Sequence, residues 1–227
     1  MKKFLMQQLK AALLKRQKVI VRDITGLGRE RRVPLEFLIK NDYIRTSALE
    51  LAAQEIYEAG VQGAAAELGV FTGDFAQYIN QVFPDRKLYL FDTFSGFDKR
   101  DLQADHARGH HTRDNQRFKT GSIDLVMSKM KHPANCIVKA GYFPDTAEGL
   151  EDERYCFVSI DADLYNPIYE GLKYFYPRLS KGGYLFVHDY NRDIFKGAKE
   201  AVRQYCAENG LTFFPLTDSG GSAVLTK

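Results

Sequence analysis

Two acidic clusters are the side chains of this sequence best suited to chemistry. Asp161 and Asp163 follow one short apolar run, and His188 and Asp189 follow another. Short apolar runs of this kind are typical of buried parallel strands, and open α/β sheets bind ligands beyond the carboxyl ends of their strands. Carboxylates that converge at such an edge repel one another. A divalent cation with oxygen ligands is the simplest group that would hold them together.

A turn between a strand and a helix gives a second signal. Glu67, Gly69 and Gly73 have the spacing E-x-G-x-x-x-G after a predicted strand. Glycines let a ligand approach the backbone, and the next helix offers amide donors at its N-terminus. Asp92 lies 19 residues after Gly73, where a carboxylate can accept hydrogen bonds from ribose hydroxyls. The spacing is neither the dinucleotide fingerprint nor a P-loop, so we expect an adenosine with a small non-phosphate substituent.

The elements that must position these residues alternate between helix and strand after residue 40. This alternation predicts an α/β, Rossmann-like, mostly parallel sheet. The last two apolar runs have no helix between them, so we expect a hairpin whose final strand is antiparallel. The seven predicted strands are 64–70, 87–92, 136–140, 156–161, 184–187, 211–216 and 222–226. The predicted helices are 48–57, capped by Thr46 or Ser47, then 74–82, 122–131, 167–179 and 197–209.

The polar stretch 98–120 has no apolar period, so it predicts a long loop. His106, His110 and His111 lie in it, as a metal or substrate patch or as solvated side chains. Because variable loops over a rigid site usually select substrates, we expect this segment to contribute to acceptor choice.

Composition favours one globular domain with an appended helical segment. No apolar stretch is long enough to span a membrane, and no signal peptide is evident. The three cysteines, Cys136, Cys156 and Cys206, have no CxxC spacing. We expect reduced structural thiols and a cytoplasmic location.

Positive charge is concentrated at the N-terminus. Residues 1–47 carry 12 Lys or Arg against 4 Asp or Glu, whereas the rest of the chain carries 20 against 25. Apolar residues at helical spacing within 4–14 predict an amphipathic helix with a solvated basic face. We expect residues 1–60 to form a helical arm that could support a homodimer, and 61–227 the main domain. Aromatic residues do not interleave the basic ones, so no nucleic acid is expected as a partner.

Five blocks of the sequence identify a family when they are taken together. They are AELGVFTGD (66–74), LFDTFSGF (90–97), GYFPDT (141–146), DADLY (161–165) and YPRLSKGG (176–183). In this order they resemble blocks of the macrocin O-methyltransferase family, within the class I S-adenosylmethionine-dependent methyltransferases. The resemblance extends over about residues 60 to 227.

The resemblance implies a role for each candidate residue. S-adenosyl-L-methionine would be bound by Glu67, Gly69, Gly73, Asp92 and Thr93. A divalent metal, usually magnesium, would be bound by Asp161 and Asp189, with Asp163 as general base. The family's second cluster is commonly Asp-Asp-Tyr, and here it is His188-Asp189-Tyr190. An imidazole suits manganese, iron or zinc better than magnesium. His188 could therefore be a metal ligand, an acid–base catalyst or a hydrogen-bond donor.

The reaction implied by the resemblance is methylation of a hydroxyl on a sugar or a sugar-bearing metabolite. A bound cation would lower the hydroxyl pKa, and Asp163, or less readily His188, would take the proton. Two alternatives stay open at this point. A D-x-D pair also occurs in metal-dependent glycosyltransferases, and a nucleoside-binding scaffold without catalysis would retain the same glycine loop.

Overall fold

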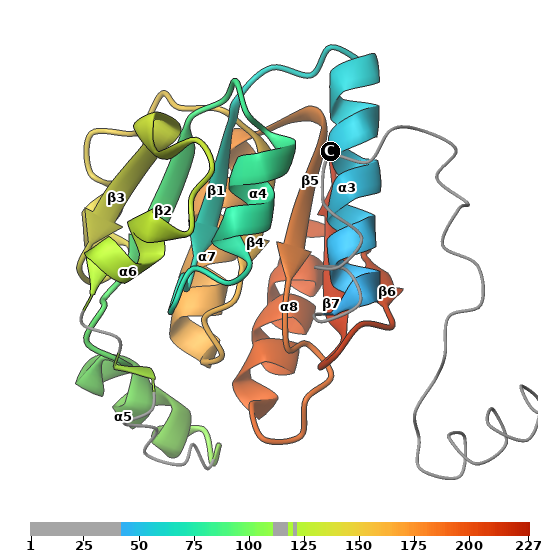
Figure 1. Ribbon diagram of the computed structural model, residues 1–227. Helices are drawn as coiled ribbons and strands as arrows, with labels where there is room; N and C mark the ends of the chain where they lie inside the picture. The colour runs from blue at the N-terminus through green and yellow to red at the C-terminus, as the bar shows by residue number, and fades with distance from the viewer. Residues whose placement is uncertain (1–41, 111–117, 120–121) are drawn as a thin grey trace, which may run out of the picture. The chain divides into compact units, whose positions relative to one another are not determined.

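The computed structural model describes residues 42–110, 118–119 and 122–227 (Figure 1). Its centre is a seven-stranded sheet in the order β3-β2-β1-β4-β5-β7-β6. The strands are β1 (Ala64–Leu68), β2 (Leu88–Asp92), β3 (Cys136–Ala140), β4 (Tyr155–Ile160), β5 (Leu179–Val187), β6 (Phe214–Leu216) and β7 (Ser222–Thr226). Strands β1 to β5 pair in parallel, and β7 runs antiparallel to both β5 and β6. The predicted Rossmann-like sheet with an antiparallel C-terminal strand is confirmed.

Helices cover both faces of this sheet. The α-helices of the described residues are α3 (Tyr43–Glu58), α4 (Ala76–Val82), α5 (Lys99–Ala107), α6 (Ile123–Ser128), α7 (Tyr165–Arg178) and α8 (Lys196–Asn209), of which all but α5 cover the sheet. Buried side chains of α3, α4 and α6 form one apolar cluster with the sheet, and those of α7 and α8 form another. Figure 1 shows these two groups of helices in front of the sheet and behind it. Because both faces are covered, the central strands are apolar runs, as in β4, which is buried along its whole length.

Helix α5 corrects the predicted loop at 98–120. Asp98 caps it by accepting a hydrogen bond from the Arg100 backbone N–H at 2.9 Å. Its two buried side chains are carboxylates, Asp101 and Asp105. Asp105 Oδ1 accepts from the backbone N–H of Tyr165 at 3.0 Å. The helix is therefore held by polar contacts, and a search for apolar periodicity overlooks it.

Helix α3 begins earlier than predicted. Asp42, rather than Thr46 or Ser47, is its N-cap, and its carboxylate accepts from the backbone N–H groups of Ile44 and Arg45. The helix packs on the sheet through side chains such as Leu49, which is fully buried. The boundary predicted at residue 60 stays a prediction, and the helix predicted within 4–14 lies outside the described residues.

Two other predictions concern single features of the chain. No helix in the described part of the chain is long and apolar enough to cross a membrane. Cys136, Cys156 and Cys206 are free thiols. Burial raises the pKa of Cys136 and of Cys156 to about 11, which keeps both thiols protonated and unreactive at neutral pH.

Because α7 packs on the sheet through Phe175, we expect removal of this ring to lower the free energy of unfolding considerably. Phe175 is fully buried, and its ring contacts those of Phe91, Phe143 and Tyr155. We expect Phe175→Ala to lower the free energy of unfolding by about 3–5 kcal/mol in urea titrations. The matched control is Lys173→Ala on the exposed face of the same helix, with an expected change below about 0.5 kcal/mol. Equal losses in the two variants would contradict the assigned core.

Candidate active site

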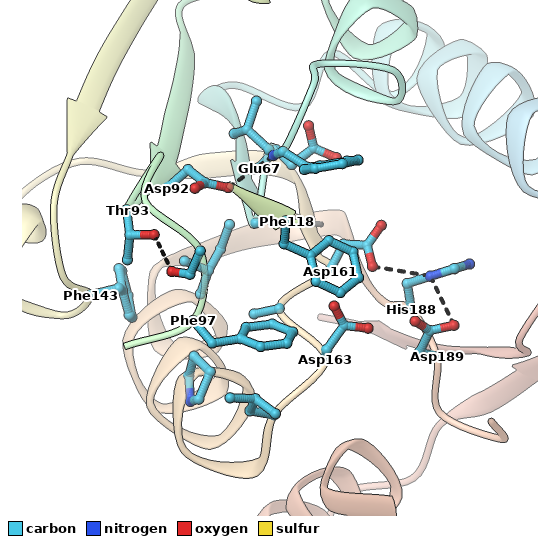
Figure 2. A pocket seen from close by; sticks show the side chains of 18 of the residues that line it. Glu67, Asp92, Thr93, Phe97, Phe118, Phe143, Asp161, Asp163, His188 and Asp189 are labelled. Carbon is cyan, nitrogen blue, oxygen red and sulfur yellow. Dashed lines mark hydrogen bonds and ion pairs between the residues drawn. The ribbon is translucent and has the colours of Figure 1, made fainter. Parts of the chain in front are cut away.

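A cavity of about 310 Å³ opens at the carboxyl ends of the parallel strands (Figure 2). Residues at or directly after four neighbouring strands line part of it. These are Glu67 and Gly69 at β1, Asp92 and Thr93 at β2, Asp161 and Asp163 at β4, and His188 and Asp189 at β5. Of the residues predicted for the site, only Gly73 is not among those lining the cavity.

The glycine loop after β1 owes its sequence to close packing. Gly69 has a φ of 88°, and a Cβ at this position would lie 2.1 Å from the backbone oxygen of Asp161. Only glycine allows β1 and the chain after β4 to approach so closely. A Cβ at Gly73 would instead meet Val126 of α6 at 3.0 Å. Gly69 therefore shapes the cavity, whereas Gly73 lets α6 pack against the loop.

Asp92 is fixed at the end of β2 by two backbone donors. Its Oδ2 accepts from the Phe71 N–H at 2.8 Å, and its Oδ1 accepts from the Phe94 N–H at 2.6 Å. The Thr93 hydroxyl donates to the carbonyl oxygen of Gly96 at 2.5 Å and so closes the following turn. The carboxylate is thus oriented before any ligand binds, with further lone pairs free to accept hydrogen bonds.

Glu67 is almost completely buried at the end of β1. It is 1% exposed, and its Oε2 has no hydrogen-bond partner. Burial raises the pKa of its carboxyl well above the usual range, although the charge of Arg45 opposes the shift. An unpartnered buried oxygen beside a cavity is suited to a hydrogen-bond donor on a ligand or a water.

The first acidic cluster is built around Asp161. Its Oδ2 accepts from Arg45 Nη1 at 2.8 Å, and its Oδ1 lies 3.1 Å from His188 Nδ1. Burial alone would raise the pKa of Asp161, but Arg45 and His188 hold it well below its usual range. Asp161 is therefore a carboxylate with a cationic partner on each oxygen.

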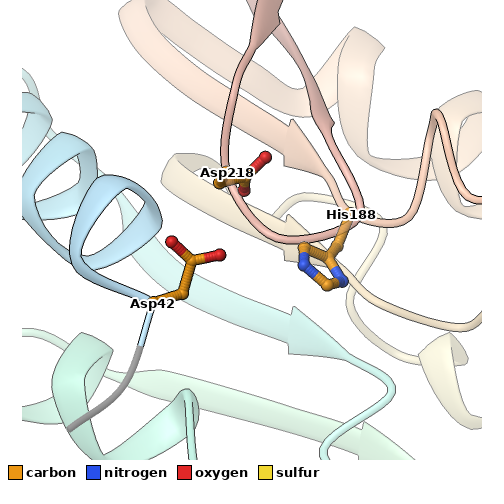
Figure 3. A group of neighbouring side chains, drawn as sticks. All are labelled: Asp42, His188 and Asp218. Carbon is orange, nitrogen blue, oxygen red and sulfur yellow. The ribbon is translucent and has the colours of Figure 1, made fainter. Parts of the chain in front are cut away.

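His188 lies among carboxylates on two sides. Its Nδ1 is 3.4 Å from Asp189 Oδ1 as well as near Asp161. Figure 3 shows Asp42 and Asp218 beside the same ring, and one ligand atom of each lies within 4.8 Å of the others. Burial lowers the pKa of His188, but the charge of Asp161 and the hydrogen bonds to Asp161 and Asp189 together outweigh this effect and raise it to about 10. The ring is a charged imidazolium at neutral pH, held by the surrounding acids.

Asp163 and Asp189 form a second pair on the floor of the cavity. They are 8% and 2% exposed, and both have left-handed backbone, with φ of 62° and 55°. Burial and then the neighbouring Asp189 raise the pKa of Asp163 well above its usual range. His188 and Asp163 hold the pKa of Asp189 down. In this pair protonated Asp163 donates a hydrogen bond to ionised Asp189.

Several residues that line the cavity were not predicted from the sequence. Arg45 of α3 is 7% exposed and lies on the same face as Leu49 and Ile56. An arginine at helical spacing from buried apolar residues is the signal that could have found it. Asp101 of α5 also lines the cavity, and burial raises its pKa to about 6. Six phenylalanines complete the wall: Phe71, Phe75, Phe97, Phe118, Phe143 and Phe195.

The histidines of the 98–120 segment lie elsewhere. His110 Nε2 is 2.8 Å from Glu200 Oε2, so this ring is paired with α8. Neither His106 nor His110 is among the described residues that line the cavity. His111 lies outside the described residues.

The residues predicted to bind a divalent ion are brought together, but they already have cationic partners. One ligand atom from each of Asp161, His188 and Asp189 lies within 4.8 Å of the others. Arg45 Nη1 forms an ion pair with Asp161 Oδ2, and Arg192 Nη1 lies 3.2 Å from Asp189 Oδ1. Guanidinium groups do not lose their charge in proteins. As they lie, these side chains fit protein cations better than a divalent metal, and the ligand set inferred from the sequence stays a prediction.

Sheet order, glycine loop and acidic cluster together define an S-adenosylmethionine-dependent methyltransferase fold. The structure of the O-methyltransferase NovP is similar, with a TM-score of 0.66 and 21% identity over 81% of this chain and 79% of that one. Residues 41–225 match the macrocin-O-methyltransferase (TylF) family, and the chain belongs to this family. It is thus an S-adenosylmethionine-dependent O-methyltransferase.

Two curated relatives have sequences similar to this one. An 8-demethyl-8-(2,3-dimethoxy-alpha-L-rhamnosyl)-tetracenomycin-C 4'-O-methyltransferase of Streptomyces olivaceus is 24% identical, over 79% of this chain and 71% of the relative. A mycinamicin III 3''-O-methyltransferase of Micromonospora griseorubida is 27% identical, over 74% of this chain and 70% of the relative.

The charge on His188 predicts a pH-dependent contribution to stability. Because its folded pKa of about 10 lies above the unfolded value of 6.5, the contribution is fully present below pH 6.5 and is lost as pH rises through 10. We expect the difference in unfolding free energy between wild type and His188→Gln to be largest near pH 6 and to vanish by about pH 10.5.

The control for this experiment is His106→Gln, which replaces an exposed histidine. Its difference from wild type should stay near zero at every pH. A His188→Gln difference that did not change between neutral and alkaline pH would show that the ring is uncharged at neutral pH.

Proposed function

We propose that this enzyme transfers a methyl group from S-adenosylmethionine to a hydroxyl of a sugar or a sugar-bearing metabolite. The observation that carries the proposal is that Gly69 and Asp92 line the same cavity as Asp161 and Asp163. The activities for which both curated relatives are named, each that of an O-methyltransferase, support it. One of these names specifies a rhamnosyl group, which favours a sugar as the acceptor.

The cofactor would lie over the loops that follow β1 and β2. Gly69 lets its backbone approach the ligand, and the anchored carboxylate of Asp92 would accept from the ribose hydroxyls. Glu67 Oε2, buried and without a partner, would accept a hydrogen bond from the amino acid portion or from a bridging water. The phenylalanines around the cavity would exclude water from the reacting groups.

When bound, S-adenosylmethionine supplies an electrophilic methyl group, and the electrons of the broken S–C bond stay on sulfur. The acceptor oxygen forms the new O–C bond with a lone pair and must lose its proton. Asp163 would take that proton in its ionised form, after the proton that it holds in the resting pair has left to solvent, because a carboxylate with a raised pKa is a stronger base than an ordinary one. The protonated Asp163 then donates to Asp189, which stabilises the product of the transfer.

The divalent ion expected from the sequence stays a prediction, and the pairing of Asp161 with Arg45 and His188 argues against it. The glycosyltransferase alternative is wrong, because the chain belongs to an O-methyltransferase family. The homodimer formed by the N-terminal helices and the cytoplasmic location stay predictions.

Direct binding and product measurements test the proposed function. S-adenosylhomocysteine should bind in calorimetry, whereas uridine diphosphate should not. Incubation with methyl-labelled S-adenosylmethionine and rhamnose-bearing acceptors should add one labelled methyl to an acceptor hydroxyl, located by mass spectrometry. Cofactor binding without transfer to any glycoside or sugar nucleotide would favour the scaffold without catalysis.

If Asp92 binds the ribose of the cofactor, its substitution should lower the affinity for the cofactor. Asp92→Ala removes an ionised acceptor for the ribose and should cost about 1.5–3 kcal/mol. We expect S-adenosylhomocysteine to bind roughly 10–100-fold more weakly in calorimetry. Asp152→Ala, an exposed aspartate before β4, is the control and should bind as wild type does. Unchanged affinity in Asp92→Ala would remove Asp92 from the cofactor site.

If Asp163 is the base, its substitution should lower the turnover number without weakening cofactor binding. Asparagine tolerates the left-handed backbone at this position but cannot accept the proton. Asp163→Asn should lower kcat by about 10²–10⁴-fold and leave the affinity for S-adenosylhomocysteine unchanged. The control is Asp193→Asn, at an exposed aspartate beyond β5. A kcat within a factor of about two of wild type would reject Asp163 as the base.

A further inference from the structure

The acidic cluster of this enzyme contains its own fixed cations. Arg45 Nη1 lies 2.8 Å from Asp161 Oδ2, and Arg192 Nη1 lies 3.2 Å from Asp189 Oδ1. Each carboxylate that the sequence suggested for a divalent ion is thus paired with a guanidinium group. Of the two arginines, Arg45 is the buried one, with 8% of its side chain exposed, against 43% for Arg192.

Arg45 is held in place from several directions. Its Nη2 donates to Ser159 Oγ at 3.1 Å, and its guanidinium carbon lies 3.7 Å from the centre of the Phe75 ring. The helix that carries it is anchored by Leu49 and Ile56, both fully buried. Moving the guanidinium away from Asp161 would break an ion pair, a hydrogen bond and a cation–π contact together. Its position is therefore built into the fold.

A fixed guanidinium changes what can bind beside it. A divalent ion coordinated by Asp161 would lie within a few ångströms of Arg45, and like charges at such distances repel strongly in a buried site. The oxygen that faces away from Arg45 is already 3.1 Å from His188 Nδ1. An ion bound here would have to compete with both partners, whereas the arginine neutralises Asp161 in the arrangement that the side chains already have.

We propose that Arg45 is a positioning residue that takes the place of a divalent ion, so that this enzyme holds its acidic cluster together without a bound metal. The inference deepens the proposed methyl transfer and rests on it for its catalytic meaning. Asp161 is oriented by its ion pair with Arg45 at 2.8 Å, and this fixes the neighbouring turn that carries Asp163. The acceptor proton then goes to Asp163 directly.

Metal uptake by the full-length protein tests this proposal. Mn²⁺ is added to chelator-treated protein saturated with S-adenosylhomocysteine, and the bound ion is measured by electron paramagnetic resonance. Wild type should take up no stoichiometric Mn²⁺. Arg45→Gln leaves Asp161 without its fixed cation and should bind Mn²⁺ at least about tenfold more tightly. Arg45→Lys keeps the charge and should resemble wild type.

The control variant is Arg192→Gln, at the exposed arginine, where the gain in Mn²⁺ affinity should be smaller than in Arg45→Gln. One tightly bound Mn²⁺ per wild-type chain would overturn the proposal, and so would an Arg45→Gln variant that binds cofactor normally but gains no Mn²⁺ affinity. If Arg45→Gln fails to fold, the wild-type titration and Arg45→Lys still decide the question.

Activity provides a second readout. Methyl transfer by wild type should change by less than about twofold on addition of a chelator. A loss of transfer that Mg²⁺ restores would overturn the proposal. The Mn²⁺ titration needs no acceptor, so a failure to methylate any sugar would reject the proposed function and leave this result unaffected.

Discussion

The ion pair between Arg45 and Asp161 is the interaction on which the site depends. Burying two charges is costly and is repaid only when their hydrogen bonds are well satisfied. Here the guanidinium also contacts Ser159 and the ring of Phe75, although its Nε is buried without a hydrogen-bond partner, and the carboxylate also contacts His188. Removing Arg45 would leave Asp161 with His188 as its remaining cationic partner. The pair therefore links helix α3 to the residue that follows β4.

The parallel sheet explains why so many functional groups meet at one place. Strands β2, β1, β4 and β5 are neighbours, and each ends at the same edge of the sheet. The residues that follow them share a cavity although they are far apart in sequence. The absence of a Cβ at Gly69 lets the loop after β1 lie against the backbone of Asp161. This contact places the predicted adenosine site directly beside the acids.

The sheet and most of the site could be predicted because both depend on local signals. Apolar runs mark the strands, and Asp92, Asp161 and Asp189 can be found because they end or closely follow such runs. Arg45 could not be found in the same way, since it lies in a basic stretch and becomes a buried residue only when α3 packs on the sheet. Helix α5 was missed because carboxylates, not apolar side chains, form its buried face. Long-range pairing of charges leaves no period in a sequence.

The polar attachment of α5 has a consequence for how such an enzyme can diversify. Asp105 reaches the start of α7, and Asp101 accepts a hydrogen bond from the Tyr142 hydroxyl at 3.0 Å. A helix secured at a few anchoring points can change its remaining side chains without any repacking of the hydrophobic interior. Mutations along this rim would therefore alter the shape offered to incoming molecules at little cost in folding, so new acceptors can be explored while the catalytic framework is conserved.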